Sequence, residues 1–123
     1  MNEDGFDEMT TRPSTENLIF NRKKHTPVIY ICGPIKGYDF NERKETFLNV
    51  ENFLKRKGYV AVNPLSNITD PDSDKRSEYM RNDIAELVKC DYICILDGYL
   101  NSEGCLLEIS IANKCGTKQI AIR

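Results

Sequence analysis

Four short apolar runs alternate along this chain with segments of helical periodicity, and this alternation restricts the possible folds more than any other feature. The runs cover residues 28–32, 59–62, 92–96 and 119–122. The first is β-branched and almost continuously apolar, which is typical of a strand buried on both faces of a parallel sheet. Strands that alternate with helices predict an α/β fold, namely a doubly wound (Rossmann or flavodoxin-like) parallel sheet of about four to five strands with flanking helices.

Three helices are expected between these strands. The first begins near Asp39 or Asn41, either of which can cap it, and ends before Gly58. The other two cover about residues 75–89 and 103–115. Ligands of doubly wound sheets bind beyond the carboxyl ends of the strands. The polar loops expected at that edge are residues 33–37, 63–74 and 97–102.

Length and charge favour one small domain that handles small molecules. The 123 residues suffice for a single domain with a cleft. Residues 1–25 are mostly polar and charged, so we expect a flexible N-terminal extension before a domain at residues 26–123. The net charge of -2 argues against a nucleic-acid polymer as partner, because proteins that bind one usually carry a basic face.

The hydropathy pattern gives no sign of a membrane segment or a signal peptide. No run approaches eighteen or so consecutive apolar residues. The N-terminus is acidic, whereas a signal peptide begins with a basic and then an apolar stretch. We therefore expect a cytoplasmic protein without a membrane partner.

The cysteines are expected to be reduced thiols of the core. The chain has five, an odd number, and four of them, Cys32, Cys90, Cys94 and Cys105, lie among apolar neighbours. There is no C-x-x-C pair, and His25 is the only histidine. We therefore expect no metal site and no cofactor.

Glu108 is a carboxylate inside an apolar helical segment. Helical projection at about 100° per residue places it between Ile111 and Ala112, on a surface expected to face other protein. Burial raises the pKa of a carboxyl and costs several kcal/mol unless another group compensates. Glu108 is therefore a paired structural group or a reactive one.

Other candidate residues have both a functional and a structural interpretation. Asp83 borders an apolar helix stripe and can be reactive or an edge residue, while Tyr30 can be a site hydroxyl or a core phenol. The loop at residues 33–37 can bind a phosphate or form a plain tight turn. Ser102 can contact a ligand or cap the third helix.

Three segments in order carry a family resemblance: residues 30–37, residues 81–91 before an apolar strand, and residues 102–112. Together they resemble the nucleoside 2-deoxyribosyltransferase superfamily. The likeness is strongest to its branch of deoxynucleoside 5′-monophosphate N-glycosidases and to small uncharacterised phage and bacterial relatives. It extends over residues 28–122.

The resemblance implies roles for individual residues. Glu108 corresponds to the nucleophile on C1′ of a deoxyribosyl group, and Tyr30 to the hydroxyl that orients it. Asp83 corresponds to the acid that hydrogen-bonds the leaving base or assists its protonation. The implied substrate-binding residues are Gly33, Pro34, Ile35, Lys36, Gly37, Ser102 and Gly104.

The resemblance also bears on phosphate binding and assembly. Ser102 matches a phosphate-binding serine of the monophosphate hydrolases, and Lys36 stands in place of a phosphate-contacting arginine, without its bidentate fork. Pro34 stands where the monophosphate hydrolases have a serine, although other branches also have a Gly-Pro loop. Longer relatives continue beyond the position of Arg123 into a segment that completes the site across a dimer interface. The resemblance therefore implies a homodimer or a higher homo-oligomer.

The expected function is cleavage of the N-glycosidic bond of a (deoxy)nucleoside 5′-monophosphate, which releases free base and (deoxy)ribose 5-phosphate. A carboxylate beneath C1′ can stabilise or trap the oxocarbenium-like state, as in retaining glycosidases. The alternatives are a nucleoside 2-deoxyribosyltransferase, an NAD glycohydrolase and a non-catalytic nucleotide-binding module. A salt bridge between Glu108 and a basic side chain, or a cleft too closed for attack at C1′, would favour the binding module.

Overall fold

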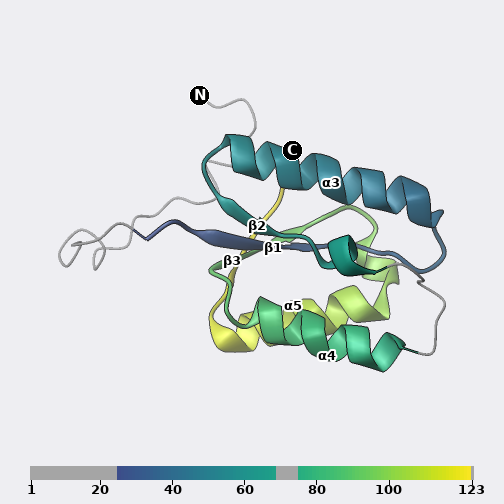
Figure 1. The fold of residues 1–123 in the computed structure, drawn as a ribbon. Coiled ribbons are helices and arrows are strands. Elements are labelled where there is room, and N and C mark those ends of the chain that lie inside the picture. Colours follow the sequence, from purple (N-terminus) through teal and green to yellow (C-terminus); the bar gives the residue numbers. More distant parts are fainter. Residues whose placement is uncertain (1–24, 69–74, 123) are drawn as a thin grey trace.

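The computed structural model describes residues 25–68 and 75–122 and contains one sheet of four parallel strands in the order β2-β1-β3-β4 (Figure 1). The predicted N-terminal extension therefore lies outside the described residues, except for His25. The elements are β1 (Val28–Cys32), α3 (Phe40–Arg56), β2 (Val60–Val62), the 3-10 turn η1 (Pro64–Asn67), α4 (Arg76–Leu87), β3 (Tyr92–Ile95), the 3-10 turn η2 (Tyr99–Asn101), α5 (Glu103–Cys115) and β4 (Lys118–Ile120).

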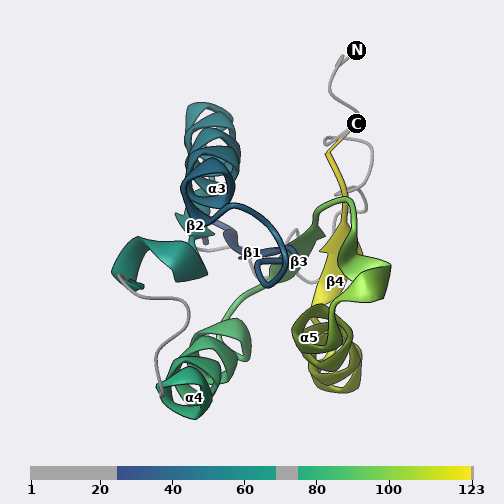
Figure 2. The ribbon, with the colours of Figure 1, turned by 90° about the vertical axis from the view of Figure 1, so that its right-hand side faces the viewer.

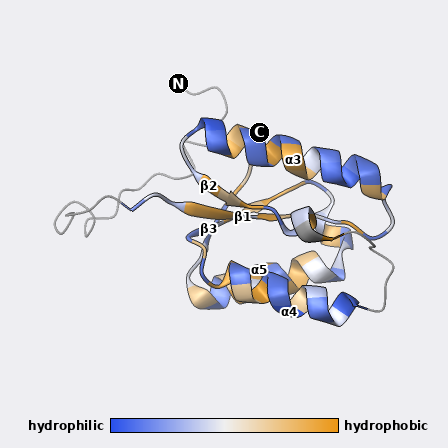
Figure 3. Cartoon of the chain, viewed as in Figure 1, coloured by the Kyte–Doolittle hydropathy of each residue, from blue (hydrophilic) through white to orange (hydrophobic). Residues whose placement is uncertain are grey.

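The fold is a three-layer α/β structure, and the doubly wound prediction is confirmed. Helix α3 covers one face of the sheet, and α4 and α5 cover the other (Figure 2). The strands are mostly apolar, whereas the helices carry polar residues on their outer sides (Figure 3). The chain builds outward from β1 in both directions, so the order reverses between β1 and β3. A ligand cleft is expected beyond the carboxyl ends of strands at such a reversal.

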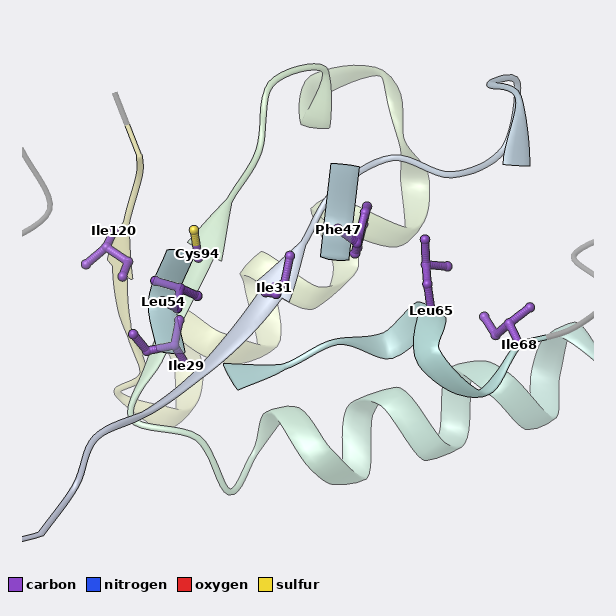
Figure 4. Close-up of a cluster of buried hydrophobic side chains, with 8 residues drawn as sticks. All are labelled: Ile29, Ile31, Phe47, Leu54, Leu65, Ile68, Cys94 and Ile120. Atoms are coloured by element: carbon purple, nitrogen blue, oxygen red, sulfur yellow. The ribbon is translucent and has the colours of Figure 1, made fainter. Parts of the chain in front are cut away.

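Strand β1 divides its side chains between the two layers. Ile29 and Ile31 belong to the cluster on the α3 side, together with Phe47 and Leu54 (Figure 4). Successive side chains of a strand point to opposite faces. Tyr30 accordingly belongs to the second buried cluster, which contains residues of α4 and α5. The strand alternation thus decides which helices Tyr30 can meet.

The predicted element boundaries agree with the structure to within two residues. Asp39 is the cap of α3, and its Oδ2 accepts from the backbone N–H of Glu42 at 3.0 Å. The predicted strand at 59–62 begins at Val60, because Tyr59 N still donates to the carbonyl of Leu54 at 3.1 Å. The predicted strand at 119–122 instead covers Lys118–Ile120. Its last residue, Ile120, pairs with Cys94 of β3.

The cysteine prediction is also confirmed. All five cysteines are free; Cys32, Cys90, Cys94 and Cys105 are buried, and Cys115 is exposed. Within the described part of the chain, no helix is long and apolar enough to cross a membrane.

Candidate active site

The buried carboxylate of Glu108 is paired with a phenol. Tyr30 is fully buried in the middle of β1, and its Oη donates to Glu108 Oε2 at 2.8 Å. Glu108 lies on α5 and is 7% exposed, so its predicted burial is confirmed. Across residues 25–68 and 75–122, Glu108 makes no ion pair with a basic side chain. The salt bridge that would have favoured a simple binding module is therefore not seen within these residues.

Asp83 lies close to this pair. It is half-buried on α4, and α4 and α5 cover the same face of the sheet (Figure 2). Burial, and after it the charge of Glu108, together raise the pKa of Asp83 to about 7. An electrostatic effect of Glu108 on Asp83 requires the two carboxyls to be near each other. The arrangement with Asp83 and Glu108 on opposite faces is excluded.

The ionisation of the three groups is coupled. Burial raises the pKa of Glu108 to about 7, against the opposing effect of its hydrogen bonds with Tyr30 and Cys32. Burial, and then the charges of Glu108 and Asp83, raise the pKa of the Tyr30 hydroxyl far above its ordinary value. Tyr30 therefore remains a donor. Both carboxyls therefore have pKa values raised toward neutral pH.

The loop after β1 is a tight turn that presents Lys36. Tyr38 N donates to the carbonyl of Ile35 at 3.2 Å, which closes a four-residue turn. Gly37 has φ +89° at the third position, the left-handed conformation that a type II turn requires there. Lys36 occupies the second position and is exposed. The loop is therefore a tight turn that exposes Lys36.

The beginning of the same loop is packed against β3 and the segment after it. A Cβ at Gly33 would lie 3.0 Å from Leu96 Cδ1 and 3.2 Å from Arg43 Nη2, so the close approach needs a glycine. Pro34 is buried, and its Cγ would lie 3.1 Å from a Cβ at Gly98. Gly33 and Pro34 thus hold the loop in place.

Ser102 and Gly104 form the start of α5. Ser102 Oγ accepts from Cys105 N at 3.2 Å, which confirms the capping interpretation of this serine. A Cβ at Gly104 would make an ordinary contact of 3.5 Å with Met80 Cε. Ser102 therefore has a structural partner, and Gly104 lies beside a side chain of α4.

Two adjoining cavities share Ile68, Tyr79 and Asp83 as lining residues. The first, of about 540 Å³, is lined by Tyr30 and by several polar side chains. These polar side chains are Glu51, Asn63, Ser66, Asn82 and Glu86. Asp83 faces both cavities and is therefore placed to contact a ligand that extends from one into the other.

The second cavity, of about 370 Å³, combines aromatic walls with two cations. It is lined by the turn at residues 35–37, by Tyr38 and Phe40, and by Arg76 and Met80 of α4. The volume of each cavity is in the range typical of small-molecule sites, roughly 300–1,000 Å³, and so is the combined volume of the two. Within the described residues, no three potential metal ligands come together.

The structure brings some of the predicted site residues together and leaves others apart. Tyr30, Asp83 and Glu108 converge. Ile35, Lys36 and Gly37 line the second cavity with Asp83. The predicted site residues that line neither cavity are Gly33, Pro34, Ser102, Gly104 and Glu108 itself.

Sequence reasoning did not single out several residues of the cavity walls. Asn63 Nδ2 donates to Glu51 Oε1 at 3.0 Å, which fixes a polar wall of the first cavity. No local sequence pattern predicts that contact, because α3 meets the end of β2 only in the folded chain. Arg76 and Tyr79 could have been found, since they lie seven and four residues before Asp83 and share its helix face.

The chain resembles known proteins in sequence and in fold. A family model described as "Domain of unknown function (DUF4406)" matches residues 27–121. A search of solved structures finds a 2-deoxyribosyltransferase from the psychrotolerant bacterium Bacillus psychrosaccharolyticus, with TM-score 0.58 and 18% identity over 76% of this chain and 70% of that chain. At this identity the likeness shows a shared fold. No curated protein sequence matches the chain. Because the family model covers most of its length, the chain belongs to the DUF4406 family.

Proposed function

We propose that this protein cleaves the N-glycosidic bond of a (deoxy)nucleoside 5′-monophosphate and releases free base and (deoxy)ribose 5-phosphate. The observation that carries the proposal is the buried Glu108, which accepts a 2.8 Å hydrogen bond from Tyr30. Glu108 itself lines neither cavity, but Tyr30 lines the first cavity and the neighbouring acid Asp83 lines both. The fold shared with a 2-deoxyribosyltransferase supports it.

Glu108 and Asp83 have different roles in the proposed reaction, Glu108 as the nucleophile and Asp83 as the proton donor and acceptor. Glu108 Oε2 accepts from Tyr30, which leaves Oε1 to attack C1′. As the C1′–N bond breaks through an oxocarbenium-like state, the departing base nitrogen takes the proton of Asp83. The product is a glycosyl ester on Glu108. Water then attacks C1′, Asp83 removes its proton, and Glu108 departs as a carboxylate with the sugar phosphate free.

The surroundings of Glu108 and Asp83 support one distribution of charge before the reaction, with Glu108 ionised and Asp83 protonated. Tyr30 donates to Glu108 and so favours its ionised form, as a nucleophile requires. Within the described residues no hydrogen bond stabilises ionised Asp83, whose pKa burial and the charge of Glu108 raise. We therefore assign the proton that the leaving base takes to Asp83 and the attacking carboxylate to Glu108. Two acids in different environments, one charged and one neutral, are what this reaction needs.

The second cavity is the proposed site of phosphate recognition. Lys36 lines it and is exposed at the tip of the turn, where its ammonium can meet the 5′-phosphate. Ser102, to which the family resemblance assigns a phosphate contact, lines neither cavity and caps α5 through its Oγ. A hydroxyl that accepts from a backbone N–H can still donate to a phosphate oxygen.

Base exchange is the second candidate. If another base reaches C1′ of the glycosyl ester before water does, the same residues produce a 2-deoxyribosyltransferase reaction. The shared fold favours this candidate, because the similar solved structure is a 2-deoxyribosyltransferase.

We also infer that the protein forms a homodimer or a higher homo-oligomer. Leu100, Leu106 and Leu107 are 68%, 44% and 45% exposed at η2 and α5, which leaves apolar side chains for a second copy to cover. Light scattering at micromolar concentration measures the assembly. A fully active monomer would contradict the inference.

The decisive experiment follows base release. The protein is incubated with deoxynucleoside and ribonucleoside 5′-monophosphates, the matching nucleosides and NAD, and free base is measured by chromatography. A second set of reactions contains a different free base, so that exchange and hydrolysis are told apart by the products. We expect hydrolysis of at least one monophosphate.

Two variants of α5 test the nucleophile. Glu108→Gln is nearly isosteric and should lose about three or more orders of magnitude in base release, because its amide cannot attack C1′. Glu103→Gln, an exposed position of the same helix, serves as the matched control and should retain activity. Tight nucleotide binding by wild type without any base release, and unchanged in Glu108→Gln, would refute the enzyme and support a binding module.

A further inference from the structure

One face of α4 runs the length of the second cavity. Arg76, Tyr79, Met80 and Asp83 all line it. They are spaced i, i+3, i+4 and i+7, the spacing of residues on one side of a helix. Arg76 and Asp83 are two turns apart, about 10 Å along the helix axis at 1.5 Å per residue. The proposed acid and a cation therefore point into the same cavity from successive turns of one helix.

The turn after β1 adds a second cation to the lining of this cavity. Lys36 projects from the turn after β1, and that turn and the beginning of α4 lie at the same edge of the sheet (Figure 1). Within the described residues, neither Lys36 nor Arg76 pairs with a carboxylate. The acids that line the cavity are Asp83 and Asp39, and an oxygen of Asp39 is already engaged in capping α3. The two cations are thus available to an anionic ligand.

Lys36 and Arg76 can contact a phosphate in complementary ways. A lysine ammonium acts as a point charge on a phosphate, whereas a guanidinium donates two parallel hydrogen bonds to two phosphate oxygens. Lys36 alone does not provide that bidentate contact. Arg76, which enters the same cavity from another element, can provide it. The site therefore has the two kinds of donor that hold a phosphate in a fixed orientation.

We propose that Arg76 is a specificity-determining residue that, with Lys36, binds the 5′-phosphate of the nucleotide in the second cavity and makes the site prefer monophosphates to nucleosides. The inference rests on the proposed function for the identity of the ligand. It adds a residue from α4, which places the phosphate at the beginning of that helix and the glycosidic bond near Asp83, two turns further on.

The test compares four proteins on two substrates. Wild type, Arg76→Ala, Arg76→Lys and Arg81→Ala are assayed for base release from 2′-deoxynucleoside 5′-monophosphates and from the matching nucleosides. Arg81 is the matched control, since it is an exposed arginine of α4 that lines neither cavity. Circular dichroism verifies that each variant is folded.

We expect Arg76→Ala to lower kcat/KM for monophosphates at least tenfold, mainly through KM, and to leave nucleosides within about twofold. A tenfold loss corresponds to about 1.4 kcal/mol. Arg76→Lys should recover part of the loss because it keeps the charge, and Arg81→Ala should match wild type. Equal losses on both substrates, or no loss on monophosphates, would overturn the inference while the proposed function stands.

If wild type releases no base, direct binding measurements separate the phosphate site from the proposed glycosidase activity. Isothermal titration of the same monophosphates and nucleosides then gives the dissociation constants. A monophosphate preference that Arg76→Ala abolishes and Arg81→Ala keeps would support the phosphate site and reject the glycosidase. Wild type that binds no monophosphate, or binds it no better than the nucleoside, would overturn both.

Discussion

The buried carboxyl of Glu108 should destabilise the folded protein at alkaline pH. Its pKa rises from an ordinary value of 4.5 to about 7, with burial as the main cause. Between these two pH values the folded protein keeps a proton that the unfolded chain has lost. The free energy of unfolding therefore falls as pH rises from about 4.5 to about 7, and the full cost is present above pH 7. Glu108→Gln removes this cost.

The size of the effect follows from the pKa shift. A shift from 4.5 to about 7, at about 1.4 kcal/mol per pKa unit, corresponds to about 3 kcal/mol. Below pH 5 both the neutral acid and the amide can accept from Tyr30, so the variant should match wild type within about 1 kcal/mol. Above pH 8 Glu108→Gln should be more stable by about 3 kcal/mol. In a domain of this size, that raises Tm by roughly 10 °C.

Thermal and urea denaturation followed by circular dichroism at pH 5 and pH 8.5 provide the assay. Glu103→Gln, the exposed control on α5, should change the free energy of unfolding by less than about 1 kcal/mol at both pH values. A Glu108→Gln protein that is no more stable than wild type at pH 8.5 would refute the reasoning. The carboxylate would then have a compensating partner in the folded state.

Three further predictions concern the same edge of the sheet. Tyr30→Phe removes the 2.8 Å bond that favours ionised Glu108, so the acidic limb of the pH–rate profile should move to higher pH and base release should fall at least tenfold. Asp83→Asn removes the proton donor and should lower kcat by about 10² to 10⁴-fold, with nucleotide binding by calorimetry largely retained. Gly33→Ala puts a Cβ 3.0 Å from Leu96 Cδ1, and urea denaturation should show a loss of about 1–3 kcal/mol.

The sequence by itself determined the layers and the outline of the site. The apolar run of β1 predicted a strand buried on both faces, and Asp39 predicted the beginning of α3. The position of Glu108 on an apolar helix predicted its burial. These features depend on neighbours within one turn or one strand, so the local period of the sequence encodes them.

Only the tertiary structure decided which partners these residues have. Tyr30 and Glu108 are 78 positions apart and meet because alternate side chains of β1 face the layer that contains α5. The raised pKa of Asp83 depends on how closely α4 and α5 pack. Arg76 enters the cavity of Lys36 because α4 begins at the edge of the sheet where β1 ends. Strand order, register and helix packing set such distances, and no local pattern contains them, because each distance joins segments that folding alone brings together.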